Sequence, residues 1–182
     1  MDRKLGRQEW IDAGLRVVAG HGVEAVRVER LAETLGVTKG SFYWHFKDRP
    51  ALLAALLETW KARTTNDIIA QVEAKGGDAA TRLRTLSAIA TRQDGRLEVA
   101  IRVWARQDAK ARTALKQVDK RRLAYLDSLF EALGFSSAEA SARSRLVYHA
   151  LIGQFVRGMP TRQNKRPGDW LDIVYPMLVR KG

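Results

Sequence analysis

Apolar residues recur at helical spacing along nearly the whole chain. In the N-terminal part, Ile11, Leu15 and Val18 stand at positions i, i+4 and i+7, which places them on one face of a helix. Alternating strand patterns are missing from the sequence, and it contains no Asn-Gly hairpin dipeptide. The pattern therefore predicts an all-α protein.

The first 47 residues predict a unit of three helices. A run of Gly-His-Gly at residues 20–22 ends the first helix, because glycine readily adopts a left-handed cap. Apolar spacing over residues 28–35 marks a second, short helix, and Thr38 is a suitable N-cap for a third. Only a few residues, beginning with Gly36, separate the second helix from the third, which is the spacing of a helix-turn-helix.

A fourth helix is predicted to begin after Asp48, which is a good N-cap, and Pro50 is tolerated in its first turn. The stretch rich in Leu and Ala continues to about Ile69, long enough to link an N-terminal head to a larger body. We therefore predict two domains, a helix-turn-helix domain over residues 1–47 and a helical domain over residues 48–182.

The rest of the chain predicts further helices near residues 79–92, 96–107, 109–133, 137–158 and 168–180. Ser136 and Glu139 have the spacing of a capping box at the start of the fourth of these. Residues 160–169 are bracketed by prolines and predict a long loop.

The third helix predicts two faces of different chemistry. At 100° per residue, Phe42 and Phe46 lie 40° apart and are expected to point into the head. Glycine inside a helix costs about 1 kcal/mol relative to alanine, so a glycine on the opposite side indicates close approach by another molecule. The outward face holds Gly40, Ser41, Tyr43 and Trp44.

These outward side chains suit the major groove of DNA, which admits a helix. Lys39 can donate to guanine O6 and N7, and Ser41 can bond to either kind of base. The Tyr43 hydroxyl, His45 and Lys47 suit phosphate oxygens. The alternative, that aromatic side chains only pack the head, is accepted for the two phenylalanines.

Net charge supports an anionic partner but does not locate its binding surface. The chain has 32 Lys and Arg against 20 Asp and Glu, a formal charge of +12. Residues 1–47 contain eight basic and six acidic residues, so nearly all of the surplus lies outside the predicted head. Recognition by the head must therefore depend on where its side chains are placed rather than on bulk charge.

Composition also limits the kinds of site and the cellular compartment that are expected. The absence of cysteine excludes disulfides, thiolate metal sites and cysteine nucleophiles. The N-terminus lacks the apolar region of a signal peptide, and no apolar run approaches the length of a membrane span. A cytoplasmic protein without a membrane partner is expected.

Residues 10–57 resemble the N-terminal domain of the tetracycline-repressor (TetR) family of transcriptional regulators. The resemblance joins, in order, the first-helix pattern, "HG", "LAETLGV", "TKGSFYWHF" and the following leucines. It implies a homodimer that places two heads in successive major grooves of a pseudo-palindromic, double-stranded operator DNA. By position, the family's DNA contacts fall on Thr38, Lys39, Ser41, Tyr43, Trp44, His45, Lys47 and Arg49.

One departure from the family concerns the start of the second helix. Val26 and Arg27 stand where family members commonly have Thr or Ser, so the side-chain N-cap is lost. Arg27 is instead predicted to contact a phosphate. We interpret Glu29, in the first helical turn, as a partner of the helix dipole, and an acceptor from cytosine N4 is the alternative.

The resemblance also implies that the body dimerises through its last two helices and binds a small-molecule effector among the middle ones. Two apolar stripes predict the dimer interface, with monomer core as the alternative: Val147, Leu151, Gln154, Phe155, Leu171, Val174, Tyr175 and Leu178. Large rings and one polar group are the candidates for the effector pocket, with ordinary packing as the alternative for each: Trp60, Arg102, Trp104, Tyr125, Phe130 and Tyr148.

Residues 106–122 contain seven Lys and Arg against two Asp and Glu. A solvated helix face is the simpler interpretation, and an anionic effector or extra DNA backbone contacts are the alternative. With three histidines and no phosphate-cradling loop, the sequence predicts no catalytic site, no metal site and no cofactor.

We therefore predict a DNA-binding transcriptional regulator, a repressor released from its operator by an unidentified small molecule. An activator, or a regulator without an effector, has the same sequence features. A non-specific basic protein that binds DNA or a membrane surface is the alternative from another class.

Overall fold

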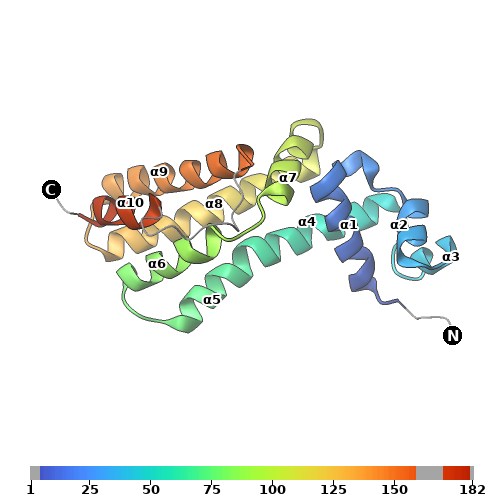
Figure 1. Ribbon diagram of the computed structural model, residues 1–182, viewed down its shortest axis with the longest axis horizontal. Helices are drawn as coiled ribbons and strands as arrows, with labels where there is room; N and C mark the ends of the chain where they lie inside the picture. The colour runs from blue at the N-terminus through green and yellow to red at the C-terminus, as the bar shows by residue number, and fades with distance from the viewer. Residues whose placement is uncertain (1–4, 159–169, 181–182) are drawn as a thin grey trace. The chain divides into compact units, whose positions relative to one another are not determined.

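The computed structural model describes residues 5–158 and 170–180, and the side chains of residues 170–173 lie outside what it describes. Every regular element among these residues is helical, which confirms the predicted all-α fold (Figure 1). In chain order the elements are α1 (Arg7–His21), η1 (Val23–Ala25), α2 (Val28–Leu35), α3 (Lys39–Tyr43), α4 (Arg49–Lys61), the π-helical segment η2 (Ala62–Asn66), α5 (Asp67–Lys75), α6 (Ala79–Ala90), α7 (Arg96–Gln107), α8 (Ala109–Ala132), α9 (Ser137–Val156) and α10 (Trp170–Val179).

The chain divides by its contacts into two compact units. The first comprises residues 1–63 and 96–116, and the second comprises residues 64–95 and 117–182. The predicted domain boundary between residues 47 and 48 was drawn from expected functions, whereas these two units are defined by contacts. The boundary therefore stays a prediction.

In the first unit, α1 packs against α2, α4 and α7. Its apolar face is buried, with Trp10 and Val18 fully inaccessible and Ile11 only 1% exposed. Gly14 allows α1 and α4 to cross closely, since a Cβ at this position would lie 2.8 Å from Leu56 Cδ2. The helical periodicity of the first 20 residues thus predicts the correct buried face.

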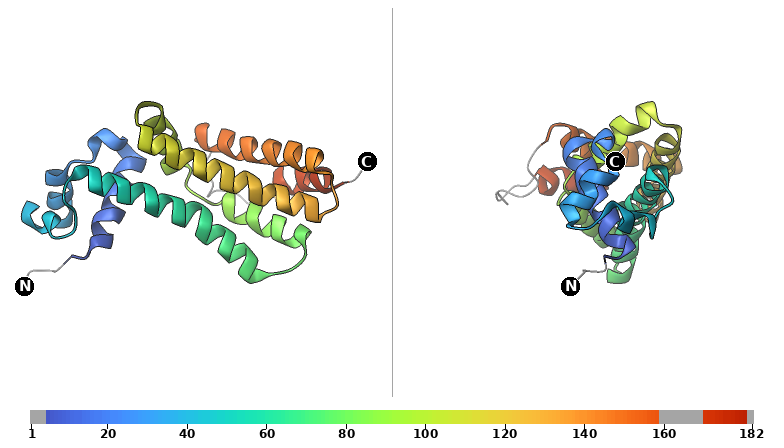
Figure 2. Two further views of the ribbon diagram at one scale, coloured as in Figure 1. Left: turned by 180° about the vertical axis from the view of Figure 1, so that it is seen from behind. Right: turned by 90° about the vertical axis from the view of Figure 1, so that its right-hand side faces the viewer.

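The fourth helix starts as predicted and runs further than predicted. The Asp48 carboxylate accepts a hydrogen bond from the Ala51 N–H at 2.8 Å, and Pro50 lies in the first turn. The expected end near Ile69 is wrong, because helical structure continues through η2 and α5 to Lys75 (Figure 2). Gly76, with φ of 67°, then ends the helix in a conformation that favours glycine.

In the second unit, α9 lies alongside the later part of α8 in both views (Figures 1 and 2), and α10 packs against α6. Phe130, Ala140 and Leu83 are buried at the centre of its apolar core. The predicted capping box is present, with Ser136 and Glu139 bonding to each other's backbone N–H. The predicted loop at residues 160–169 lies outside the described residues.

Candidate nucleic-acid interface

A glycine turn fixes α3 against α2. Gly36 adopts the left-handed conformation at φ 69° and ψ 34°, and its N–H caps the end of α2. The Val37 N–H bonds to the Ala32 carbonyl at 3.0 Å, which completes the hydrogen bonding of that helix end. Thr38 then occupies the N-cap of α3 as predicted, although its side chain makes no capping hydrogen bond. The helix-turn-helix is therefore held by backbone geometry.

Aromatic packing anchors the inner side of α3. Phe42 is completely buried and Phe46 is 4% exposed, which confirms that both rings pack the head. The Phe42 ring lies 5.2 Å from Trp10 in an edge-to-face contact and 5.4 Å from Phe46, measured between ring centroids. The short helix is thus fixed by rings contributed from α1 and from its own C-terminal side.

The outer side of α3 is exposed. Trp44 is 88% exposed and Tyr43 is 55% exposed, which is unusual for two large aromatic side chains of one short helix. A Cβ on Gly40 would meet only Thr38 Oγ1, at 3.6 Å, so the packing of the protein itself does not require a glycine there. The exposed side also includes Thr38, Lys39 and Lys47, with Ser41 partly exposed at its edge.

Lys39 forms an ion pair that the sequence analysis did not anticipate. Its Nζ donates to Glu29 Oε1, across the turn between α2 and α3. This hydrogen bond raises the pKa of the Lys39 ammonium and lowers the pKa of the Glu29 carboxyl from their usual values. Both side chains are more than half exposed, so the pair lies on the surface of the head.

Three other predicted DNA contacts occupy different surroundings. His45 is partly buried, and its Nε2 lies 2.8 Å from the Leu5 carbonyl oxygen. Arg49 donates from Nε to the Val26 carbonyl at 2.6 Å and from a terminal nitrogen to the Val23 carbonyl at 2.8 Å. Arg27 is exposed at the N-cap of α2 and makes no side-chain capping bond, as its sequence implied.

The six pocket candidates fall in both units. In the first unit Trp60 and Trp104 are buried, and Arg102 pairs with the buried Glu98 at 2.9 Å. In the second unit Phe130 and Tyr148 are buried in one apolar cluster. Tyr125 donates to Glu73 at 2.5 Å, and this bond, together with burial as the largest cause, raises the pKa of the Tyr125 hydroxyl.

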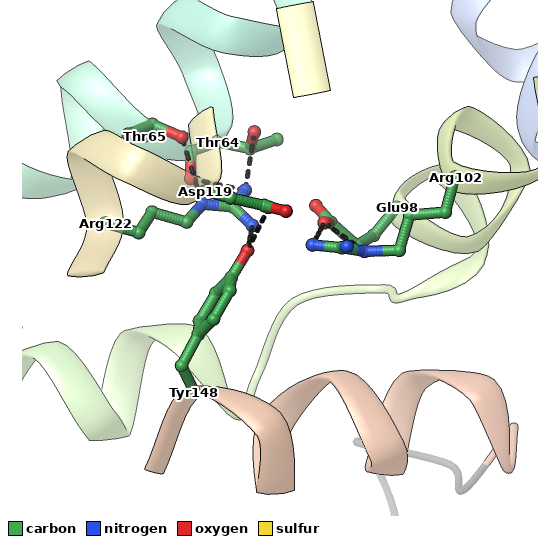
Figure 3. Close-up of polar contacts among 7 residues, drawn as sticks. All are labelled: Thr64, Thr65, Glu98, Arg102, Asp119, Arg122 and Tyr148. Carbon is green, nitrogen blue, oxygen red and sulfur yellow. Dashed lines mark hydrogen bonds and ion pairs between the residues drawn. The ribbon is translucent and has the colours of Figure 1, made fainter. Parts of the chain in front are cut away.

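Tyr148 belongs to a polar cluster that the sequence did not reveal (Figure 3). Its hydroxyl donates to Asp119 at 2.6 Å and accepts from Arg122 at 3.3 Å. Arg122 also donates to the hydroxyl of Thr65 and to the carbonyl and hydroxyl of Thr64 at 3.1–3.2 Å. Arg122 stands in the basic stretch that was interpreted as a solvated face, so that interpretation does not hold for this residue.

The predicted dimer residues are mostly turned into the second unit. Tyr175 and Leu178 are buried there, and the Tyr175 hydroxyl donates to the Ala80 carbonyl at 2.7 Å. The others that are described, Val147, Leu151, Gln154, Phe155 and Val174, are half-buried. The side chain of Leu171 lies outside the described residues.

A different face of α9 is exposed. At 100° per residue its exposed positions fall on one side of the helix. From residue 142 to the end of the helix they comprise Ala142, Arg145, Leu146, His149, Ala150, Gly153 and Val156. Leu146 is 62% and Val156 is 64% exposed, and Met177 of α10 is 69% exposed.

No helix in the described part of the chain is long and apolar enough to cross a membrane. Across residues 5–158 and 170–180, no group of three or more His, Asp or Glu is placed to hold a metal ion.

A short helix held by a left-handed glycine turn, with buried rings on one side and exposed hydrogen-bonding groups on the other, defines a helix-turn-helix domain of the DNA-binding class. Residues 11–56 match the family model described as bacterial regulatory proteins, tetR family. The match covers 46 of the 182 residues, so the family resemblance is found in the N-terminal part of the chain. The relatives that match the chain are transcriptional regulators.

Individual relatives match a stretch of similar length. The chain is 46% identical over 55 residues to the class C tetracycline repressor protein of Escherichia coli, covering 30% of this chain and 25% of that one. It is 37% identical over 60 residues to the transcriptional regulator AcrR of Shigella flexneri, covering 33% of this chain and 26% of that one. The chain therefore matches about a quarter of the length of these two curated relatives.

A solved structure agrees over nearly the whole length. The reduced form of E. coli NemR superposes with a TM-score of 0.76 and covers 94% of this chain and 95% of that one. The two sequences are 18% identical, so the likeness shows a shared fold.

Proposed function

We propose that the chain is a homodimeric transcriptional repressor that binds operator DNA through two copies of the head and is released by a small molecule. The exposed outer side of α3 carries the proposal. A helix that exposes Trp44 and Tyr43 while burying Phe42 presents a surface that only an external partner would cover. The major groove of double-stranded DNA is the partner that matches its shape and hydrogen-bonding groups.

Each predicted contact has a role that fits its position. Lys39 and Ser41 are assigned to base edges, and Gly40 allows the helix backbone to approach the groove closely. The Trp44 ring supplies an apolar face for a sugar or a thymine methyl group. The groups assigned to the phosphate backbone are Arg27, Thr38, Tyr43, His45, Lys47 and Arg49.

The bonds made by Arg49 and His45 give these two residues a second role. The guanidinium of Arg49 has five N–H groups, of which two bond to the carbonyls of Val26 and Val23. The remaining donors can reach a phosphate while the first two hold the start of α2 against α4. His45 likewise joins the segment before α1, through Leu5, to the end of α3.

The test of operator binding uses the full chain and duplexes selected from a random-sequence library. Tyr43→Ala and Lys39→Ala are each expected to weaken binding to the selected duplex at fixed salt without lowering the melting temperature. Lys39→Ala should also relax base preference at one position of each half-site. Wild-type affinity and selectivity in both variants would refute the assignment of this surface.

Dimerisation is assigned to α9 and α10. The exposed apolar side of α9 includes the small residues Ala150 and Gly153, which allow close approach of a second helix, and Leu146 adds apolar area. The half-buried residues at its edge, Val147, Leu151 and Gln154, remain part of the predicted interface.

A charge placed on this side of α9 tests the dimer. Leu146→Asp is expected to yield monomers in sedimentation velocity, because dimer formation would bury the carboxylate. Val103→Asp is the matched control, since Val103 is 57% exposed on α7, and it should leave the dimer intact. A dimer that survives Leu146→Asp at micromolar concentration would place the interface elsewhere.

Effector release requires a ligand that binds more tightly to the conformation with lower DNA affinity. The buried rings and the polar cluster around Tyr148 supply an apolar lining and polar anchors in the second unit. A compound that raises the melting temperature and weakens operator binding in the same concentration range would identify an effector. A compound that strengthens DNA binding instead would favour a co-repressor.

A further inference from the structure

The Glu29–Lys39 pair poses a question that the proposed function leaves open. A carboxylate on a surface that approaches DNA repels phosphates and lowers non-specific affinity. In addition, exposed ion pairs contribute little to stability, so stabilisation of the fold does not account for this pair. Glu29 nevertheless bonds directly to the side chain assigned to a base edge.

The pair presents donors beside an acceptor. An ammonium has three N–H groups, and the bond from Lys39 to Glu29 uses one of them. The two that remain match the adjacent acceptors O6 and N7 of guanine. The carboxylate of Glu29 has lone pairs beyond the one that Lys39 occupies, and it is stable in its charged form because Lys39 lowers its pKa.

One base pair in the major groove carries the complementary pattern. A G·C pair displays N7 and O6 of guanine as acceptors next to the N4 amino donor of cytosine. An A·T pair ends instead with the O4 acceptor and the methyl group of thymine, where a carboxylate finds no donor. A lysine and a glutamate in contact can therefore recognise both halves of a single G·C pair.

We propose that Glu29 and Lys39 act as one recognition unit for a G·C base pair in each half-site, with Lys39 on the guanine and Glu29 on the cytosine. Glu29 is thereby a specificity-determining residue contributed by α2, in addition to the contacts from α3. It also holds the flexible lysine toward the bases rather than toward a phosphate. This inference rests on the proposed operator binding.

The experiment compares base preference in wild-type protein, Glu29→Gln and Glu33→Gln. Glu33 is exposed on the same helix, so Glu33→Gln makes the same change in charge and leaves the Glu29–Lys39 bond in place. A random-sequence duplex library first defines the wild-type half-site. Fluorescence anisotropy at fixed salt then measures affinity for duplexes carrying each of the four base pairs at every half-site position.

Wild-type protein is expected to prefer G·C at one position by roughly 5- to 150-fold, the range of one good base contact. Glu29→Gln should lose about tenfold of that preference at that position alone and bind unrelated duplexes more tightly. Glu33→Gln should keep the preference. Lys39→Ala combined with Glu29→Gln should cost little more selectivity than either change alone, because both act on one base pair.

Two outcomes would overturn the inference separately from the proposed function. If Glu29→Gln keeps the base preference of wild type and changes affinity only as Glu33→Gln does, the ion pair is a bystander although operator binding stands. If wild-type protein selects a sequence with A·T at the position that Lys39→Ala affects, the assignment to G·C is wrong. Failure of wild-type protein to select any pseudo-palindromic sequence would refute operator binding itself.

Discussion

Phe42 and Trp44 are two residues apart and have opposite exposures, which separates stability from DNA binding. Phe42 is completely buried against Trp10 and Phe46, so Phe42→Ala is expected to cost about 3–5 kcal/mol in free energy of unfolding. Trp44 is 88% exposed. A fully buried aromatic ring covers roughly 150–250 Å², so the ring of Trp44 buries about 20–30 Å², which contributes less than about 1 kcal/mol at roughly 25 cal/mol per Å².

For DNA binding, Trp44 is expected to matter even though it contributes little to folding stability. Trp44→Ala should weaken operator binding by roughly 2 kcal/mol, about thirtyfold in Kd, as is common for a large ring at the centre of an interface. The measurements are urea unfolding followed by circular dichroism and anisotropy titration with the selected duplex. Val103→Ala, at an exposed apolar residue on α7, should change neither quantity.

Two results would refute this reasoning. A loss of unfolding free energy in Trp44→Ala as large as that in Phe42→Ala would mean that the ring packs against the protein. Unchanged operator affinity in Trp44→Ala would mean that the exposed ring does not meet DNA.

Three further predictions concern folding. Asp48→Ala removes the N-cap of α4 and should lower the free energy of unfolding by about 0.5–2 kcal/mol in urea, and no change would show that the cap is replaced by solvent. Gly95→Ala would place a Cβ 2.5 Å from the Cγ of Phe155, so it should cost about 1–3 kcal/mol. Phe155→Ala removes that Cγ, so the two changes combined should cost less than the sum of the single changes, and additive costs would contradict the contact. Hydrogen bonds from Thr81 lower the pKa of Asp78 below its ordinary value of 3.8. The contribution of Asp78 to stability is therefore present above that pH and is lost as the pH falls through the lowered pKa. The stability difference between wild type and Asp78→Ala should shrink in acid, and a constant difference in pH-dependent unfolding would argue against this prediction.

Features that depend on local spacing were predictable from the sequence. The two faces of α3 were predictable, because neighbouring positions on a helix differ by a fixed angle and glycine, aromatic and polar residues were clearly sorted between them. The caps at Asp48 and Ser136 were predictable for the same reason, since each bonds to a backbone N–H three residues away. The end of the helical stretch was predicted too early, although Gly76 marks it in the sequence.

Helical periodicity alone could not predict which face of α9 is exposed. Leu146, Val147, Ala150 and Leu151 are consecutive apolar pairs that cover much of the helix circumference, so they fit a stripe centred on either side. Packing against α8 and the rest of the second unit half-buries Val147 and Leu151 and leaves Leu146 and Ala150 in solvent. Only the tertiary arrangement therefore decided which face of α9 is exposed.

The sequence by itself determined the helical architecture, the helix-turn-helix and the resemblance of residues 10–57 to a known family, because these depend on spacings within a few turns of one chain segment. The tertiary structure decided the pairs formed between distant residues. Glu29 meets Lys39 across a turn, and Arg122 meets Thr64 and Tyr148 from separate helices. Such contacts depend on how helices pack against each other, and a long polar side chain has the same sequence pattern whether it ends in solvent or on a buried partner.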